Sequence, residues 1–212
     1  MYKNLMIKDF IEELSSKAST PGGGGAAALC ASLASSLTCM VFNLTVGKKK
    51  FEELDESIKN SIKNGLMNQD ENKSNFLEDI DKDAEAFIKL MAAYRMKKET
   101  IEEVNERNDK LKQGTIGALE SPLHLAEKAY LVYDDILIAT LYGNINAISD
   151  AGVSAIMIQS AIDSSILNVR INLSSLEDDE YKETILKRCK FLSLEGEKKK
   201  DHILNIVNEK IR

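Results

Sequence analysis

The longest feature of the hydrophobic pattern is a segment without a single charge, from Ala18 to Gly47, in a chain of which 29% of the residues are charged. It opens with a proline and four consecutive glycines and then becomes rich in alanine, leucine and serine. A helix that is apolar on all sides is either buried at a domain centre or embedded in lipid. Because serines and threonines are scattered around this segment, we predict a buried central helix rather than a membrane span.

The rest of the pattern predicts helices along nearly the whole chain, because apolar residues recur at intervals of three and four. No alternation of period two persists anywhere, and no internal repeat is visible. We therefore predict an all-α fold, a multihelical bundle around the buried central helix, in one domain spanning residues 1–212. The expected helices are 5–17, 21–47 (with Thr20 as N-cap), 51–96, 100–143 (kinked or restarted at Pro122), 146–173 and 178–211.

Composition and charge narrow the class of protein. A net charge of −6 argues against nucleic acid as a partner, because phosphate binding requires a basic surface. Three cysteines give an odd count without close pairs, which favours reduced thiols and a cytoplasmic location. The first seventeen residues interleave charged and apolar positions, which is not the pattern of a signal peptide.

The four glycines from Gly22 to Gly25 indicate a close approach of the backbone to something else. Each glycine costs a helix about 1 kcal/mol relative to alanine, so four in succession need a physical reason. Exposed main-chain amides at a helix N-terminus can bind an anionic or carbonyl group. A tight crossing of two helices explains the glycines equally well, and the spacing matches no nucleotide-binding loop.

Two aspartates border the apolar face of the segment 76–91. At 100° per residue, Asp81 and Asp83 lie at about 100° and about −60° from Ile80, on opposite borders of the buried face. Partial burial at such a border raises the pKa of a carboxyl group toward the range useful for proton transfer. Spacing alone favours the simpler interpretation, in which both carboxylates pair with nearby lysines.

Asp150 is the only charged residue between Ile136 and Ile162. A lone carboxylate in such a segment is costly to bury unless it is hydrogen-bonded, and Asn144 and Ser149 are near enough in sequence to do this. Asp150 is therefore a candidate functional residue or, equally, a first-turn residue stabilised by the helix dipole. Asn168 and Asn172 share one helix face, where asparagines often join helices. The lysines at 48–50 are either a solvated helix end or an anion site.

Six segments, in order along nearly the whole chain, together resemble a known family. They are STPGGGGAAAL (19–29), NLTVGKKKF (43–51), DKDAEAF (81–87), SPLHLAE (121–127), GNINAISDAGVSA (143–155) and NVRINL (168–173). In these segments the chain resembles the C-terminal domain of the formiminotransferase-cyclodeaminase family, which includes stand-alone methenyltetrahydrofolate cyclohydrolases. The glycine segment and the segment around Asp150 are the more specific of the six.

The resemblance implies a helical homodimer that acts on one-carbon derivatives of tetrahydrofolate. We expect no metal or redox cofactor, because closing or opening the folate ring transfers no electrons. It places the family's catalytic acid on Asp81 and suggests that Asp150 and Asn144 orient the pterin or stabilise the cationic carbon. The lysines at 48–50 would hold a glutamate tail. The expected catalytic residues are Asp81 and Asp150, and the expected substrate contacts are Gly22, Gly23, Gly24, Gly25, Asn43, Lys48, Lys49, Asp83, Asn144, Ser149 and Asn168.

Three functions remain open at this point. The first choice is a cyclodeaminase, which closes formiminotetrahydrofolate to methenyltetrahydrofolate and releases ammonia. The near-equal alternative is a methenyltetrahydrofolate cyclohydrolase, which opens the same ring with water to give formyltetrahydrofolate. The third is a helical dimer that binds folate or another protein without catalysis.

Overall fold

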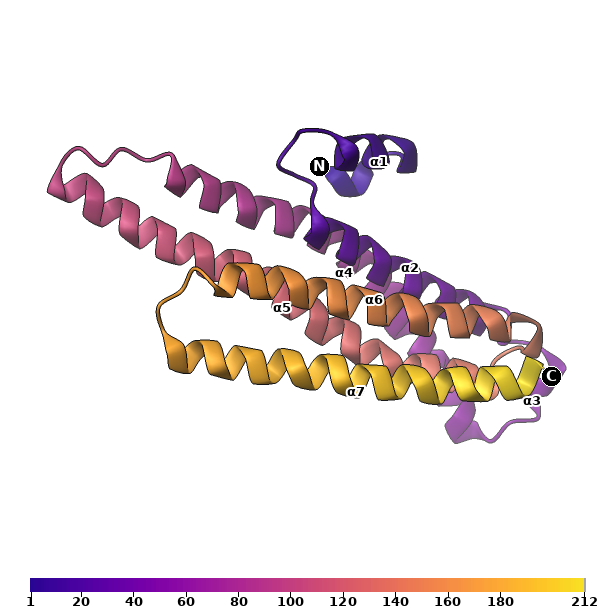
Figure 1. Cartoon of the computed structure of the whole chain (residues 1–212). Helices are drawn as coiled ribbons and strands as arrows, with labels where there is room; N and C mark the ends of the chain where they lie inside the picture. Colours follow the sequence, from indigo (N-terminus) through magenta and orange to yellow (C-terminus); the bar gives the residue numbers. More distant parts are fainter. Residues whose placement is uncertain (212) are drawn as a thin grey trace.

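The computed structural model describes residues 1–211, and over that range it contains helices and no β-strand (Figure 1). The all-α prediction is therefore confirmed. In chain order the elements are the 3-10 helix η1 (Tyr2–Asn4), α1 (Ile7–Ser15), α2 (Gly23–Asn43), α3 (Lys49–Glu52), α4 (Glu56–Tyr94), α5 (Ile101–Tyr142), the 3-10 helix η2 (Ile145–Ala147), α6 (Ile148–Leu173) and α7 (Asp179–Ile211).

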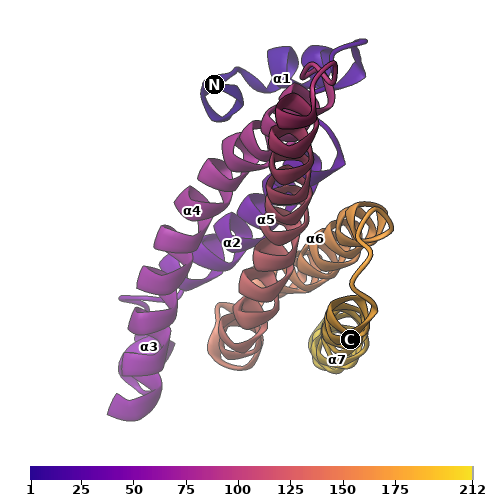
Figure 2. The ribbon, with the colours of Figure 1, turned by 90° about the vertical axis from the view of Figure 1, so that its left-hand side faces the viewer.

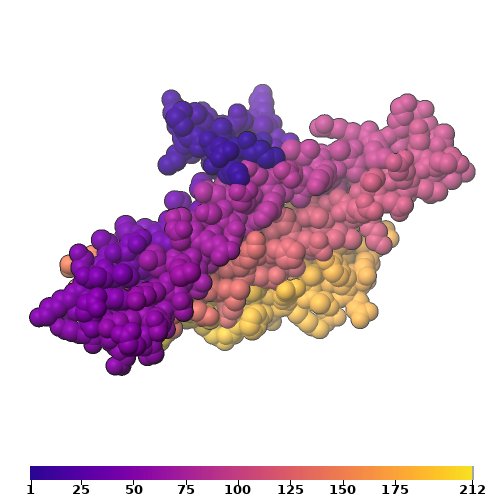
Figure 3. Space-filling model, turned by 180° about the vertical axis from the view of Figure 1, so that it is seen from behind, coloured from indigo at the N-terminus to yellow at the C-terminus, as the bar shows by residue number. Residues whose placement is uncertain are grey.

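Four long helices form the body of the molecule, and α7 covers one side of it. Helix α2 packs between α4 and α6, α5 packs on the opposite side against the same two helices, and α7 lies against α5 and α6 (Figure 2). The α4–α5 hairpin extends beyond the other helices, and α1 projects from the bundle near the start of α2 (Figures 1 and 3). This arrangement leaves α2 with neighbours along its whole length.

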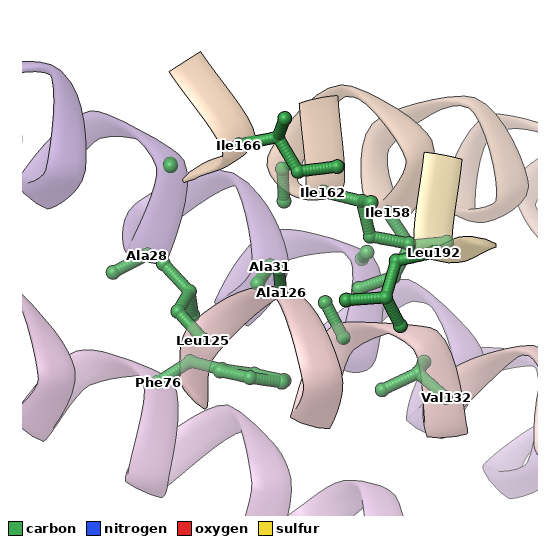
Figure 4. Close-up of a cluster of buried hydrophobic side chains, with 14 of the residues drawn as sticks. Ala28, Ala31, Phe76, Leu125, Ala126, Val132, Ile158, Ile162, Ile166 and Leu192 are labelled. Atoms are coloured by element: carbon green, nitrogen blue, oxygen red, sulfur yellow. The ribbon is translucent and has the colours of Figure 1, made fainter. Parts of the chain in front are cut away.

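Helix α2 is the buried central helix that the sequence predicts. Its alanines at 28, 31 and 34 are fully buried, and their small side chains let the neighbouring helices approach closely. Figure 4 shows Ala28 and Ala31 beside Phe76 of α4, Ala126 of α5 and Ile162 of α6. By length and composition alone, α2 and the segment Ile145–Leu173 could each cross a membrane, but more than half of each lies inside the bundle.

Several predicted helix boundaries are wrong. Thr20 and Pro21 precede α2 instead of starting it, and Gly22 is the N-cap. The helix ends at Asn43, before Gly47, whose φ of 75° is one that glycine adopts without strain. The lysines at 48–50 begin the short helix α3, so the expected helix 51–96 is divided near Glu53.

Pro122 neither ends nor restarts α5, which is continuous from Ile101 to Tyr142. Proline removes one hydrogen bond from a helix and crowds the preceding turn. Pro122 is buried among the neighbouring helices, and its adjacent residue Leu123 belongs to the main core. Tertiary packing of α5 therefore outweighs the local cost of the proline.

A buried polar network fixes α7 against α5 and α6. The hydroxyl of Tyr133 donates to Gln159 Oε1 (2.8 Å), and Gln159 Nε2 donates to Asp163 (3.1 Å). The Ser193 hydroxyl of α7 donates to the other oxygen of Asp163 (2.7 Å). The bond between Gln159 and Asp163 lies within α6, whereas the other two join α6 to α5 and to α7, so the network specifies how α7 docks.

Two glycines in long helices provide a matched test of packing. A methyl group on Gly65 would lie 2.9 Å from the buried ring of Phe42, whereas one on Gly117 would meet nothing within 4 Å. Alanine gains about 1 kcal/mol of helix propensity at either position, but overpacking costs about 1–3 kcal/mol. We therefore expect Gly117→Ala to raise the free energy of unfolding and Gly65→Ala to lower it. Urea unfolding of both variants measures the difference, and equal stabilisation by both would contradict the packing described here.

Candidate active site at the glycine end of helix α2

Three helices converge at the glycine run. A methyl group on Gly24 would collide with the carboxylate of Asp83 on α4. One on Gly23 would lie 3.3 Å from both amide atoms of Asn168 on α6. The glycines therefore allow both a tight helix crossing and direct access of polar side chains to the main chain of α2. The structure thus shows the tight helix crossing, and the anion that meets the amides within the chain is the Asp83 carboxylate, whereas binding of a ligand by these amides stays a prediction.

Asp83 is the carboxylate that faces these glycines. Burial raises the pKa of Asp83 to about 6, and the main-chain N–H of Gly25 partly opposes this rise. The first-turn amides of a helix carry partial positive charge and favour an anion, but here the loss of water has the larger effect. A carboxyl group with this pKa exchanges protons readily near neutral pH.

Asp81 lies on the other border of α4, as its helical angle predicts. It is 5% exposed, and its Oδ1 accepts a hydrogen bond from the main-chain N–H of Tyr2 (2.7 Å). Its carboxylate therefore anchors the N-terminal segment instead of facing the glycines. Of the two aspartates, Asp83, two residues further along α4, is the one that faces the glycines.

Pairing with lysines, the simpler interpretation of both aspartates, is also not observed. Within residues 1–211 neither Asp81 nor Asp83 forms an ion pair. The nearby lysines are held by Asp79, which is 8% exposed and lies 2.8 Å from Lys82 Nζ and 3.1 Å from Lys128 Nζ. The sequence pattern did not distinguish Asp79, whose two partners come from different helices.

The expected site residues divide between the two ends of α2, which are about 30 Å apart for a helix of 21 residues. Gly22 to Gly25, Asp81, Asp83 and Asn168 gather at the N-terminal end. The other end holds Asn43, Lys48, Lys49, Asn144, Ser149 and Asp150. The expectation that Asp81 and Asp150 serve one catalytic centre is therefore not met within a single chain.

At this far end Asn144 has a structural role. Its Nδ2 donates to the carbonyl of Leu44 (3.0 Å), and its Oδ1 accepts from the N–H of Asn146 (3.0 Å). Its own N–H donates to the Thr45 hydroxyl (2.8 Å). These bonds tie the start of η2 to the end of α2. Asp150 lies in the first turn of α6, as predicted for a residue that is stabilised by the helix dipole.

The same end carries a basic groove of about 540 Å³. Its lysines are Lys48, Lys49, Lys50 and Lys210, and no carboxylate lines it within residues 1–211. Lys210 of α7 donates to the carbonyls of Thr140 and Leu141 (2.7 Å each), so it also caps the end of α5. Sequence reasoning found the first three lysines and missed Lys210, which is 160 residues away and has no local signal.

Across the described residues, no cluster of three or more His, Cys, Asp or Glu side chains is placed to hold a metal ion.

The sequence pattern described as formiminotransferase-cyclodeaminase matches residues 6–191, which include both ends of α2. The chain belongs to the formiminotransferase-cyclodeaminase family. It is 35% identical to a methenyltetrahydrofolate cyclohydrolase of Methylorubrum extorquens over the full length of both chains. It is 34% identical over 173 residues to the formimidoyltransferase-cyclodeaminase of Gallus gallus, covering 82% of this chain and 31% of that protein.

A crystal structure of a formiminotetrahydrofolate cyclodeaminase from Thermotoga maritima has the same fold. It superposes with a TM-score of 0.87 over the whole of both chains at 21% sequence identity. The fold of this family member is therefore shared with a distant relative, and the resemblance seen in the sequence segments is confirmed at the level of the family.

The raised pKa of Asp83 predicts a pH-dependent stability. The folded chain holds a proton on Asp83 up to about pH 6, whereas the unfolded chain releases it near pH 4. The stability from this proton is therefore full below about pH 4 and lost as the pH rises through about 6. We expect Asp83→Asn to match the parent protein at pH 4 and to exceed its free energy of unfolding by about 2 kcal/mol at pH 7.5. Urea unfolding at both pH values measures this, and a difference that does not change with pH would disprove the shift.

Proposed function

We propose that this family member is a folate one-carbon enzyme, and that Asp83 is the group that moves the proton. The observation that carries the proposal is a half-buried carboxylate with a raised pKa placed against the main-chain amides of Gly24 and Gly25. A protonated acid and a set of main-chain donors are what ring closure with loss of ammonia requires. The family and the names of its relatives supply the substrate class.

The cyclodeaminase reaction uses this site in two steps. The anilino nitrogen of formiminotetrahydrofolate attacks the formimino carbon, which becomes tetrahedral, and the proton of the anilino N–H passes to water. The amino group on that carbon leaves as ammonia only after it gains a proton, and Asp83 supplies that proton. A carboxyl group with a pKa of about 6 is partly protonated at neutral pH, so activity in this direction should fall as the pH rises through that value.

The cyclohydrolase reaction is the second candidate, and the full-length relative from Methylorubrum extorquens favours it. Water attacks the methenyl carbon, the bond from that carbon to the pterin-ring nitrogen breaks as this nitrogen takes up a proton, and the remaining hydroxyl proton is released to solvent as formyltetrahydrofolate forms. Here the ionised form of Asp83 accepts a proton from the attacking water, so activity should rise as the pH passes through about 6. Both reactions pass through a tetrahedral carbon between two folate nitrogens, so one site serves either.

We also propose a homodimer that is formed through the shared outer face of α2 and α6. Exposed apolar side chains follow both helices at intervals of 3, 4, 7 and 11 residues, each of which returns close to the same side of a helix, and α2 contributes no charge to this face. They are Leu33, Met40, Leu44, Val153, Ile156, Leu167 and Ile171. An exposed patch of this kind on a folded protein is typical of an interface.

The homodimer would unite the two ends of α2. A two-fold axis that crosses the middle of the face perpendicular to α2 would bring the glycine end of one chain to the lysine end of its partner, because such an axis reverses the direction of the helix. The lysines of the basic groove could then hold the glutamate tail of a substrate whose pterin lies near Asp83. Three unpaired thiols support the proposal of a cytoplasmic enzyme, and the chemistry itself calls for no redox cofactor.

Two aspartate variants test which carboxylate moves the proton. We expect Asp83→Asn to lower the turnover number by roughly 10²- to 10⁴-fold, the usual contribution of a positioned acid. Asp81→Asn should lower it by less than about tenfold, because the amide oxygen can still accept the bond from Tyr2. Formation or decay of the methenyl chromophore from each folate derivative measures turnover, with ammonia release as the second readout.

The outcomes separate the candidate functions. Growth of the chromophore with ammonia release supports cyclodeaminase, and faster decay of added methenyltetrahydrofolate supports cyclohydrolase. No change with either compound would contradict an enzymatic role. If Asp81→Asn lost activity and Asp83→Asn kept it, Asp81 would be the residue that transfers the proton.

A charged residue on the α2–α6 face should separate the subunits. We expect Leu33→Glu, at a position that is 46% exposed, to sediment as a monomer where the parent protein sediments as a dimer. Burying a carboxylate in an apolar interface costs several kcal/mol unless it is paired. Leu131→Glu is the matched control, because Leu131 is 66% exposed on α5 away from this face. Equal sedimentation of all three proteins would place the interface elsewhere.

A further inference from the structure

The first residues of the chain lie beside the glycine site and contact two of its elements. Helix η1 packs against α4, and Figure 1 shows the N-terminus close to the segment that leads into α2. Tyr2 makes contacts at both of its ends. Its main-chain N–H donates to Asp81 of α4 (2.7 Å), and its side-chain hydroxyl reaches the loop just before the glycines.

The contact with that loop is made of two hydrogen bonds to one residue. The Tyr2 hydroxyl donates to the carbonyl oxygen of Thr20 (3.1 Å) and lies 2.8 Å from the Thr20 hydroxyl. Thr20 is 8% exposed, and Pro21 beside it is also buried. The loop that leads into α2 is therefore connected through Tyr2 to the helix that carries Asp83.

Gly24 and Gly25 are buried against α4, but the start of the glycine run is held less firmly. The N-cap Gly22 has no side chain to close the helix, and a methyl group on it would meet nothing within 4 Å. Pro21 approaches Gly25, since a methyl group on Gly25 would lie 3.5 Å from Pro21 Cβ. A movement of the loop would therefore be transmitted to the glycines that cover Asp83.

We propose that Tyr2 is a positioning residue. It holds the Thr20–Pro21 loop against α4 and so maintains the close contact between Gly24 and the Asp83 carboxylate. The proposal rests on the proposed role of Asp83 in proton transfer. Tyr2 does not face the reacting atoms and acts only through the loop. The resemblance to the family does not include Tyr2 among the expected site residues, and no periodic pattern in the sequence distinguishes this tyrosine.

The surroundings of Asp83 make it sensitive to such a movement. On α2 it faces the uncharged Gly24 and Gly25, and the neutral Asn168 of α6 lies beside Gly23. The charged groups nearby have partners of their own: Asp81 is held by Tyr2, Lys3 by Glu78, and Lys82 and Lys128 by Asp79. Hydration is therefore what a loosened loop would change, and more water would lower the pKa of Asp83.

The test is Tyr2→Phe, which keeps the ring and the bond from the main chain to Asp81 but removes both contacts with Thr20. We expect the pKa of Asp83, followed by carboxyl ¹³C NMR and assigned with Asp83→Asn, to fall from about 6 by about one unit toward its ordinary value near 4. The part of the pH–rate profile that follows the titration of Asp83 should shift to lower pH by the same amount. The turnover number should fall by about fivefold to tenfold, the loss expected for one or two net hydrogen bonds.

A second pair of variants tests the same contact from the side of the loop. Thr20→Val removes the hydroxyl partner and should lower the pKa of Asp83, whereas Thr20→Ser keeps the hydroxyl and should restore it. The double variant Tyr2→Phe/Thr20→Val should shift the pKa by less than the sum of the single shifts, because the two changes break one shared interaction.

Tyr133→Phe is the matched control, since it removes a buried tyrosine hydroxyl bond in the network that docks α7. It should lower the melting temperature and leave the titration of Asp83 unchanged. An unchanged Asp83 pKa in Tyr2→Phe, or an equal shift in Tyr133→Phe, would overturn the positioning role. Full activity of Asp83→Asn would instead overturn the proposed function, and the NMR titration would still decide the role of Tyr2.

Discussion

The close approach of α2 to α4 at the glycine run is the contact on which the rest of the site depends. The carboxylate of Asp83 occupies space that a side chain at Gly24 would fill, so the site exists because that side chain is missing. The same approach removes water from the carboxylate and raises its pKa. One packing constraint thus creates both the shape of the site and the acidity of its principal group.

Much of the fold follows from the hydrophobic pattern, because helices with a period of 3.6 residues must bury their apolar faces against one another. The uncharged segment identifies α2 as the centre, and the pattern places α5, α6 and α7 to within a few residues. Local signals fail where tertiary contacts outweigh them. Pro122 is accommodated inside α5. Thr20 and Pro21 do not form the first turn of α2, because they belong to a loop that is hydrogen-bonded to Tyr2.

The candidate site is less predictable than the fold. Helical angles place Asp81 and Asp83 on opposite borders of α4, but they cannot tell which border will meet the glycines. That depends on contacts between residues far apart in sequence, such as the bond between Tyr2 and Asp81 across 79 positions. The division of the expected residues between the two ends of α2 was unpredictable for the same reason, because a resemblance in sequence does not give the distances between residues in the fold.

The central position of α2 also bears on how the chain is made. Its covering helix α6 begins about a hundred residues after α2 ends. At the usual pace of translation, of about 5–20 residues per second, a ribosome needs roughly 5–20 s to supply α6 after α2 has been synthesised. During that interval an uncharged, alanine- and leucine-rich segment has no native cover on that side. The arrangement that makes α2 the core of the finished protein therefore makes it a segment of the nascent chain that a chaperone would protect until α6 is made.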